Sequence, residues 1–263
     1  VAWIDNFVMR EKHNEYGGGD IMGADVPHAN GYDGSTQVVA VADTGLGGGT
    51  AATAHADIPS SRVTSIYNWP GVSDSCWSIV DDGPQDVDSG HGTHTAVSVV
   101  GDGGVSGEGK GTAPAANLVF QAVENWANMK GMCRLYYPDG YYLTGLPTDL
   151  NQLYQQAYDD GANIHSNSLG SAAAGEYTDD SRASDEFIWN HQDMLITFSA
   201  GNDGIDANGD GVVDNDSMGA PATAKNVLTV GASENDRQGD WACDSGLSGC
   251  SGQNDIFTYG EAW

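Results

Sequence analysis

Five short runs of apolar residues, each ended abruptly by a turn-forming residue, constrain the fold of this chain more than any other feature. The first begins at Gln37, continues as VVAVAD to Asp43 and stops at the glycine-rich segment TGLGGG. The others span residues 117–123, 163–169, 194–200 and 227–232. Strands that are buried on both faces of a sheet have this nearly continuous apolar character. We therefore expect five buried strands.

Three segments between these runs have the composition of helices. They are His91–Val100, Pro147–Tyr158 and Ser181–Trp189. The second has the clearest pattern, because Leu150, Leu153, Tyr154 and Ala157 share one helical face, Pro147 suits the first helical position and Gly161 marks the end. Strands that alternate with helices imply crossover connections. The sequence thus predicts an α/β fold in one domain over residues 1–263, with a mostly parallel sheet and helices on both faces.

The balance of charge excludes two classes of partner. The chain has 9 basic and 37 acidic residues and a formal net charge of -28, so it should be repelled by nucleic acid and by anionic membrane surfaces. We interpret the acidic residues as a hydrated surface suited to high salt, where self-repulsion is screened. No stretch approaches the roughly 20 apolar residues that a membrane-spanning helix needs, so we expect no membrane partner and a chain that is soluble as given.

The start of the sequence suggests processing, and its cysteines suggest secretion. The chain begins at Val1 without an initiator methionine, which suggests that an upstream segment is removed. Four cysteines are compatible with an oxidising compartment. Cys243 and Cys250 close a short loop rich in glycine and serine, so we favour that pair, and Cys76 with Cys133 would follow; free buried thiols are the alternative.

Four segments carry residues suited to chemistry at the ends of strands. Asp43 ends the first apolar run, His91 opens the segment HGTHTAVSVV, and Asn202 follows the strand MLITFSAG. An asparagine amide at such a position can donate to a developing oxyanion. Ser168, Leu169 and Gly170 end a further strand, where exposed backbone could pair with an extended peptide. Each segment alone also has a structural explanation: a strand-to-turn aspartate, a helix-capping histidine or an Asx turn.

Taken in order, the segments DTG, HGTH, NSLG and AGN resemble those of the subtilisin-like serine peptidases, the subtilases, and specifically their oxidation-stable alkaline protease branch. The resemblance implies the three-layer architecture of that family and a secreted endopeptidase acting on protein or peptide substrates. It implies that Asp43 orients the imidazole, that His91 is the general base and acid, and that Asn202 helps to form the oxyanion hole. Ser168, Leu169 and Gly170 would line the substrate cleft, and an N-terminal propeptide would be a further partner.

The chain departs from that family in one respect: the GTSMA-type segment that carries the nucleophilic serine is absent from residues 1–263. The segment Asp216-Ser217-Met218-Gly219-Ala220 resembles it, but Ser217 follows Asn202 by only fifteen residues, which is far too close for the family's order of strands. We therefore expect an incomplete, N-terminal portion of a catalytic domain. The remaining C-terminal part of the polypeptide would be its partner, and the isolated chain would be inactive.

A loop near residue 210 has the spacing of a calcium site. Asp206, Asn208, Asp210, Val212 and Asp214 place oxygen atoms at alternate positions, with the backbone carbonyl of Val212 among them. The loop departs from an EF-hand because its twelfth position is Ser217 rather than glutamate. The sequence predicts calcium here, and a surface turn rich in aspartate and asparagine is the alternative.

Other functions fit the sequence less well. A non-catalytic module that binds calcium or peptide would explain the missing serine. An aspartic protease would pair Asp43-Thr44-Gly45 with Asp244-Ser245-Gly246, but no apolar strand precedes Asp244. Zinc binding would need histidines four residues apart, whereas His91 and His94 are three apart, and Thr50 replaces the third glycine of a dinucleotide-binding turn.

Overall fold

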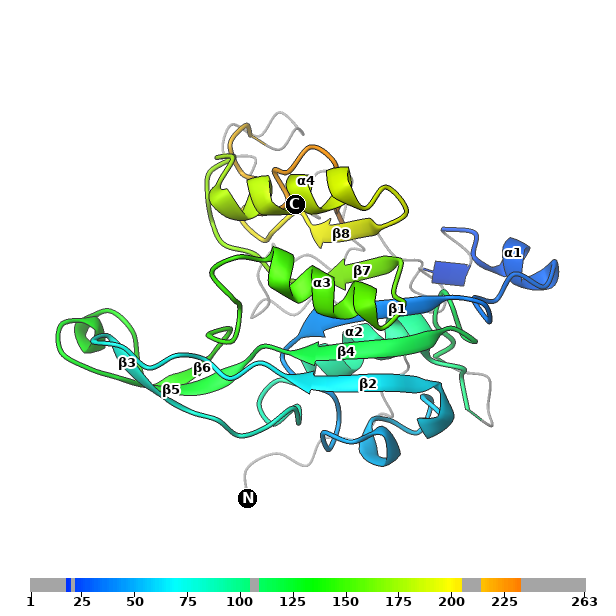
Figure 1. The fold of residues 1–263 in the computed structure, drawn as a ribbon, viewed down its shortest axis with the longest axis horizontal. Coiled ribbons are helices and arrows are strands. Elements are labelled where there is room, and N and C mark those ends of the chain that lie inside the picture. The colour runs from blue at the N-terminus through cyan, green and yellow to red at the C-terminus, as the bar shows by residue number, and fades with distance from the viewer. Residues whose placement is uncertain (1–17, 20–21, 105–108, 205–213, 233–263) are drawn as a thin grey trace, which may run out of the picture.

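The structure, a computed structural model, describes residues 18–19, 22–104, 109–204 and 214–232. Its centre is a parallel sheet of six strands in the order β2-β4-β1-β7-β8-β9 (Figure 1). Their bounds are β1 Val38–Asp43, β2 Val63–Asn68, β4 Asn117–Ala122, β7 Ile164–Asn167, β8 Leu195–Ser199 and β9 Leu228–Val230. Five of these are the strands that the apolar runs predict. The α/β class with a mostly parallel sheet is therefore confirmed.

Helices cover both faces of this sheet. The longer ones are α2 His91–Val100, α3 Asn151–Asp159 and α4 Asp179–Asn190, and the short α1 is Asp25–Ala29. The side chains of β1 alternate between the faces: Val39 and Val41 pack with α2 residues in one apolar cluster, whereas Ala42 packs with residues of α3 and α4 in another. The result is three layers, with α3 and α4 on the opposite side of the sheet from α2 (Figure 1).

The start of α3 differs from the prediction. The helix begins at Asn151 rather than at Pro147, because the side chain of Asp149 accepts a hydrogen bond from the Asn151 backbone N–H at 3.1 Å and ends the preceding turn there. The predicted buried face is confirmed: Leu150, Leu153, Tyr154 and Ala157 are all buried. The predicted end is also confirmed, since Gly161 has the left-handed φ of 88° that favours glycine.

A second, antiparallel sheet extends from the domain as an arm (Figure 1). Its strands are β3 Trp77–Val80, β5 Asn125–Met129 and β6 Gly140–Tyr142, in the order β3-β5-β6. A disulfide joins Cys76, the residue before β3, to Cys133, which follows β5. Cys243 and Cys250 lie outside the described residues. In the part of the chain that is described, no helix is both long and apolar enough to cross a bilayer.

Candidate active site

The candidate residues gather where the parallel strands end. All strands of the central sheet run in one direction, so their carboxyl ends lie at one edge, where ligands of open α/β sheets usually bind. Asp43 is the last residue of β1, Ser168 directly follows β7 and Asn202 follows β8. His91 reaches the same edge as the first residue of α2.

A hydrogen bond joins Asp43 to His91. The Nδ1 atom of His91 lies 2.6 Å from Oδ1 of Asp43. The carboxylate is 3% exposed, whereas the imidazole side chain is 47% exposed. Asp43 also accepts hydrogen bonds from the Thr44 backbone N–H at 2.7 Å and from the Thr95 hydroxyl at 3.1 Å. A buried aspartate held in this way is ready to orient and stabilise a histidine.

The bond to Asp43 fixes the tautomer of His91. An ionised carboxylate can only accept hydrogen bonds, so Nδ1 carries the proton of the neutral ring. The Nε2 atom then keeps a lone pair and can take a proton from another group. His91 can therefore act as a base at Nε2 while the Asp43 carboxylate holds Nδ1.

Close backbone approach brings α2 to the end of β1. A Cβ atom on Gly92 would lie 2.3 Å from the carbonyl oxygen of Gly45, and one on Gly45 would lie 2.5 Å from the backbone of Gln85. Only glycine allows such contacts. The glycines of the segments DTG and HGTH therefore let the turn after β1, the loop before α2 and the helix itself meet beside His91.

Asn202 lies with the predicted substrate-binding residues in one cavity. This cavity has a volume of about 380 Å³ and is lined by Ser168, Leu169, Gly170 and Asn202, among others. Asn202 is exposed, whereas Leu169 is buried. Among the described contacts, no hydrogen bond joins Asn202 to His91. The structure thus shows two groups of candidate residues, Asp43 with His91 and Asn202 with Ser168–Gly170, at one edge of the sheet.

Most of the predicted calcium ligands lie outside the residues that the structure describes. Asp206, Asn208, Asp210 and Val212 lie outside the described residues, and Asp214 is half-buried. Within the described ranges, no group of three or more histidine, cysteine, aspartate or glutamate side chains is arranged to hold a metal. Asp244, which an aspartic protease would use, also lies outside the described residues.

Ser217 has a structural contact of its own. Its hydroxyl donates a hydrogen bond of 2.6 Å to the backbone carbonyl of Asp214. This contact closes a turn; that Ser217 is not the nucleophile stays a prediction from the sequence.

Sequence reasoning missed Glu124, which lies near the Asp43–His91 pair. It lies just after β4, beside β1, and is half-buried. Burial, together with the negative charges of Asp88, Asp86, Asp43 and Asp82, raises the pKa of Glu124 to about 7. A carboxyl group that changes charge near neutral pH therefore lies within electrostatic reach of Asp43.

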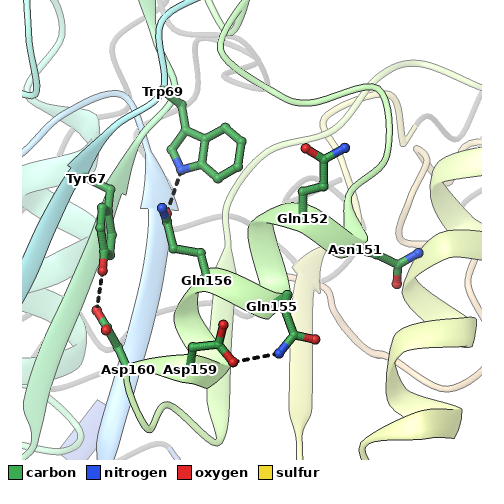
Figure 2. Close-up of a pocket in the computed structure, with 8 residues that line it drawn as sticks. All are labelled: Tyr67, Trp69, Asn151, Gln152, Gln155, Gln156, Asp159 and Asp160. Atoms are coloured by element: carbon green, nitrogen blue, oxygen red, sulfur yellow. Dashed lines mark hydrogen bonds between the residues drawn. The ribbon is translucent and has the colours of Figure 1, made fainter.

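A second cavity lies away from these residues, between the end of β2 and α3. It has a volume of about 620 Å³, and its lining is aromatic and amide-rich (Figure 2). Its innermost part is tied to the core: Gln156 accepts hydrogen bonds from the Trp69 indole N–H and from the buried amide of Gln121, each at 2.9 Å. Gln121 in turn contacts the buried His165. This chain of contacts stabilises the packing of α3 on the sheet.

The chain is similar in sequence to known proteins. Residues 34–261 match the Subtilase family (Peptidase_S8). The chain is 29% identical over 210 residues to the serine protease/ABC transporter B family protein tagD of Dictyostelium discoideum, covering 76% of this chain and 10% of that protein. It is 28% identical to the related protein tagB of the same organism, with the same coverage of both chains. The chain therefore spans about a tenth of the length of the curated relatives that it matches.

A solved structure supports the fold. The crystal structure of a lanthipeptide protease superposes with a TM-score of 0.50 at 19% identity, over 86% of this chain and 57% of that one. At this identity the likeness concerns the fold alone.

Proposed function

The chain belongs to the subtilase family, and from this premise we propose that it is the N-terminal, larger part of the catalytic domain of a secreted serine endopeptidase. The nucleophilic serine of this enzyme would lie beyond residue 263, because no GTSMA-type segment occurs within the sequence. The segments DTG, HGTH, NSLG and AGN favour the oxidation-stable alkaline protease branch. Protein or peptide substrates are the class on which such an enzyme acts.

The observation that supports this proposal most is the 2.6 Å hydrogen bond between the buried Asp43 and the half-exposed His91. A serine hydroxyl becomes a good nucleophile only when a neutral imidazole takes its proton. His91 Nε2 would take that proton as the serine oxygen bonds to the substrate carbonyl carbon, and Asp43 would stabilise the resulting imidazolium. His91 would then pass the proton to the leaving amine as the peptide bond breaks.

The cavity that contains Asn202 supports the placement of substrate. Its wall, formed by Ser168, Leu169 and Gly170, would pair with the backbone of an extended peptide. The Asn202 amide would donate a hydrogen bond to the oxyanion that forms at the substrate carbonyl. Removing such a donor typically lowers turnover by about 10²- to 10³-fold.

Secretion and calcium binding are parts of the same proposal. The Cys76–Cys133 disulfide supports an oxidising compartment. Calcium binding rests on the oxygen donors at Asp206, Asn208, Asp210, Val212 and Asp214 in the sequence.

The test uses the complete protein that includes residues 1–263. A fluorophosphonate probe, which labels activated serines covalently, should modify one serine outside these residues, identified by mass spectrometry of the digested protein. Peptide hydrolysis should fall about 10⁴-fold in Asp43→Asn, as it does in other serine peptidases, and should survive in the control Ser217→Ala. Labelling of Ser217, or hydrolysis that persists in His91→Ala, would refute the mechanism.

A further inference from the structure

The start of α2 is held by an aspartate that lies outside the helix. The first backbone N–H groups of a helix have no acceptor within the helix. The residue that precedes α2 is Gly90, which has no side chain to accept from them and has a left-handed φ of 73°. Acceptors for these groups must therefore come from elsewhere, and their source decides where His91, the first residue of α2, is placed.

Asp86 supplies acceptors with both of its carboxylate oxygens. Oδ1 accepts from the Gly90 backbone N–H at 3.2 Å and from the Thr44 hydroxyl at 3.0 Å. Oδ2 accepts from the Thr93 backbone N–H at 2.9 Å and from the Thr93 hydroxyl at 2.7 Å. Each oxygen thus binds one backbone N–H of the helix start and one threonine hydroxyl. A carboxylate at this end of a helix is also favoured by the helix dipole.

Thr44 and Thr93 extend these contacts to the end of β1, and together with Asp86 they form a network that we call the clamp. The Thr44 hydroxyl oxygen accepts from the Gly92 backbone N–H at 2.9 Å, and the Thr93 hydroxyl oxygen accepts from the Gly47 backbone N–H at 2.8 Å. The backbone N–H of Asp86 itself donates to the Gly47 carbonyl at 3.0 Å. One carboxylate therefore connects the helix that carries His91 with the turn that begins at Thr44, the residue next to Asp43.

This arrangement matters for His91 because nearly half of its side chain is exposed. Packing covers only part of the imidazole, so the position of the helix start determines how closely Nδ1 approaches Asp43. We propose that Asp86 is a positioning residue for the peptidase chemistry: it fixes the start of α2 against β1 and so sets the His91–Asp43 hydrogen bond. This inference rests on the proposed function for its effect on catalysis, whereas its effect on the hydrogen bond is independent of it.

The sharpest variant is Asp86→Asn, which keeps the size of the side chain. Because each oxygen accepts one backbone N–H, either orientation of the asparagine amide leaves a backbone N–H of Gly90 or Thr93 facing an amide N–H. The matched control is Asp185→Asn. Asp185 likewise accepts from two backbone N–H groups, of Lys225 and Asn226, and from one hydroxyl, of Tyr177, but it lies on α4.

The first measurement is the proton NMR resonance of the His91 Nδ1–H, assigned in the chain by its loss in His91→Ala. A strong hydrogen bond to Asp43 places this resonance far downfield. We expect Asp86→Asn to move it upfield or to broaden it beyond detection, and Asp185→Asn to leave it unchanged. An unchanged resonance in folded Asp86→Asn would overturn the inference.

Two further variants keep the test decisive where Asp86→Asn does not fold. Thr93→Val removes one hydroxyl of the clamp while preserving the shape of the side chain, and Thr93→Ser restores the hydroxyl. The resonance should move in Thr93→Val and return in Thr93→Ser. Equal spectra for these two variants would contradict the role of the clamp.

The second measurement is peptide hydrolysis by the complete protein. A small misplacement of a reacting group can cost up to about 10²-fold in rate, so kcat should fall about 10- to 100-fold in Asp86→Asn while KM changes little. A kcat within twofold of the original would refute the catalytic part. If the complete protein hydrolyses no peptide, the proposed function fails, and the NMR result still decides whether Asp86 sets the hydrogen bond.

Discussion

His165 should make the folded chain sensitive to mild acid. Its side chain is fully buried in β7, where Nε2 bonds to Gln121 at 2.9 Å and the ring packs edge-on against Tyr154. Among the described atoms, Nδ1 has no hydrogen-bond partner. Burial lowers the pKa of His165 to about 3, against a smaller opposing effect of the Asn167 side chain. The folded protein therefore keeps this histidine neutral.

The expected loss of stability follows from the two pKa values of this group, about 3 when folded and 6.5 when unfolded. Above pH 6.5 the histidine is neutral in both states and contributes no pH dependence. Below pH 6.5 only the unfolded state gains the proton, so the free energy of unfolding falls until the pH approaches 3. The loss amounts to about 2 kcal/mol at pH 5 and about 3 kcal/mol at pH 4, which is a large share of a typical stability of about 5–15 kcal/mol.

Urea unfolding at pH 7 and pH 5, at one salt concentration and followed by circular dichroism, measures this loss. The matched variant is His165→Gln, whose amide can still donate to Gln121 but does not titrate. Altered packing changes the stability of the variant at both pH values, so only the difference between the two values reports the titration. From pH 7 to pH 5, the original chain should lose about 2 kcal/mol more than the variant. Equal losses in the two proteins would refute the reasoning.

Three other predictions concern charge and metal. Because the pKa of Glu124 is raised to about 7 in the folded state, ionisation of this group lowers the free energy of unfolding as pH rises from about 4.5 to 7. The free energy of unfolding of Glu124→Gln should therefore exceed that of the original by about 1 kcal/mol at pH 8 and by much less at pH 4. Equal differences at the two pH values in urea titrations would contradict this. With a net charge of -28, the chain should melt at lower temperature when salt falls from about 1 M to about 10 mM, because the screening length grows about tenfold; a constant melting temperature would remove the high-salt interpretation. If the loop from Asp206 to Asp214 binds calcium, EDTA should lower the melting temperature and added calcium should restore it, whereas Asp210→Asn should respond less; identical melting curves would count against the site.

The central sheet could be predicted because its strands are buried on both faces. In the run VVAVAD, Val39 and Val41 pack on the α2 side and Ala42 packs against α3 and α4, so every position is apolar until Asp43. The strand β2 was missed because it lies at the edge of the sheet, where Thr64 is exposed and the apolar run is interrupted. The strands of the arm were missed for a similar reason. The sequence of β5, NWANM, has no apolar run, and the strand forms because it pairs with β3 and β6.

The residues of the candidate site could be predicted from the sequence, but the surroundings that the fold gives them could not. A resemblance of short segments was enough to expect Asp43 beside His91, and the structure brings them within 2.6 Å. Nothing in those segments indicates Glu124, because its raised pKa arises from carboxylates that only the fold gathers around it. The placement of Asn202 in a cavity with Ser168 likewise depends on β7 and β8 being neighbours in the sheet.

The start of α2 shows why rules that use only neighbouring residues, such as those for helix caps, do not predict such a site. Helix capping is usually recognised from the residue before the helix and from the third residue within it, which here are Gly90 and Thr93 and predict a weak start. The N–H groups of Gly90 and of the first three residues of α2 instead find acceptors in three places: the carboxylate of Asp86, the hydroxyl of Ser89 and the hydroxyl of Thr44. One of these belongs to the turn after β1, so the helix reaches its full stability only when it is docked on that strand. The contacts that cap the helix are thus the contacts that align His91 with Asp43, and a change that weakens one should weaken the other.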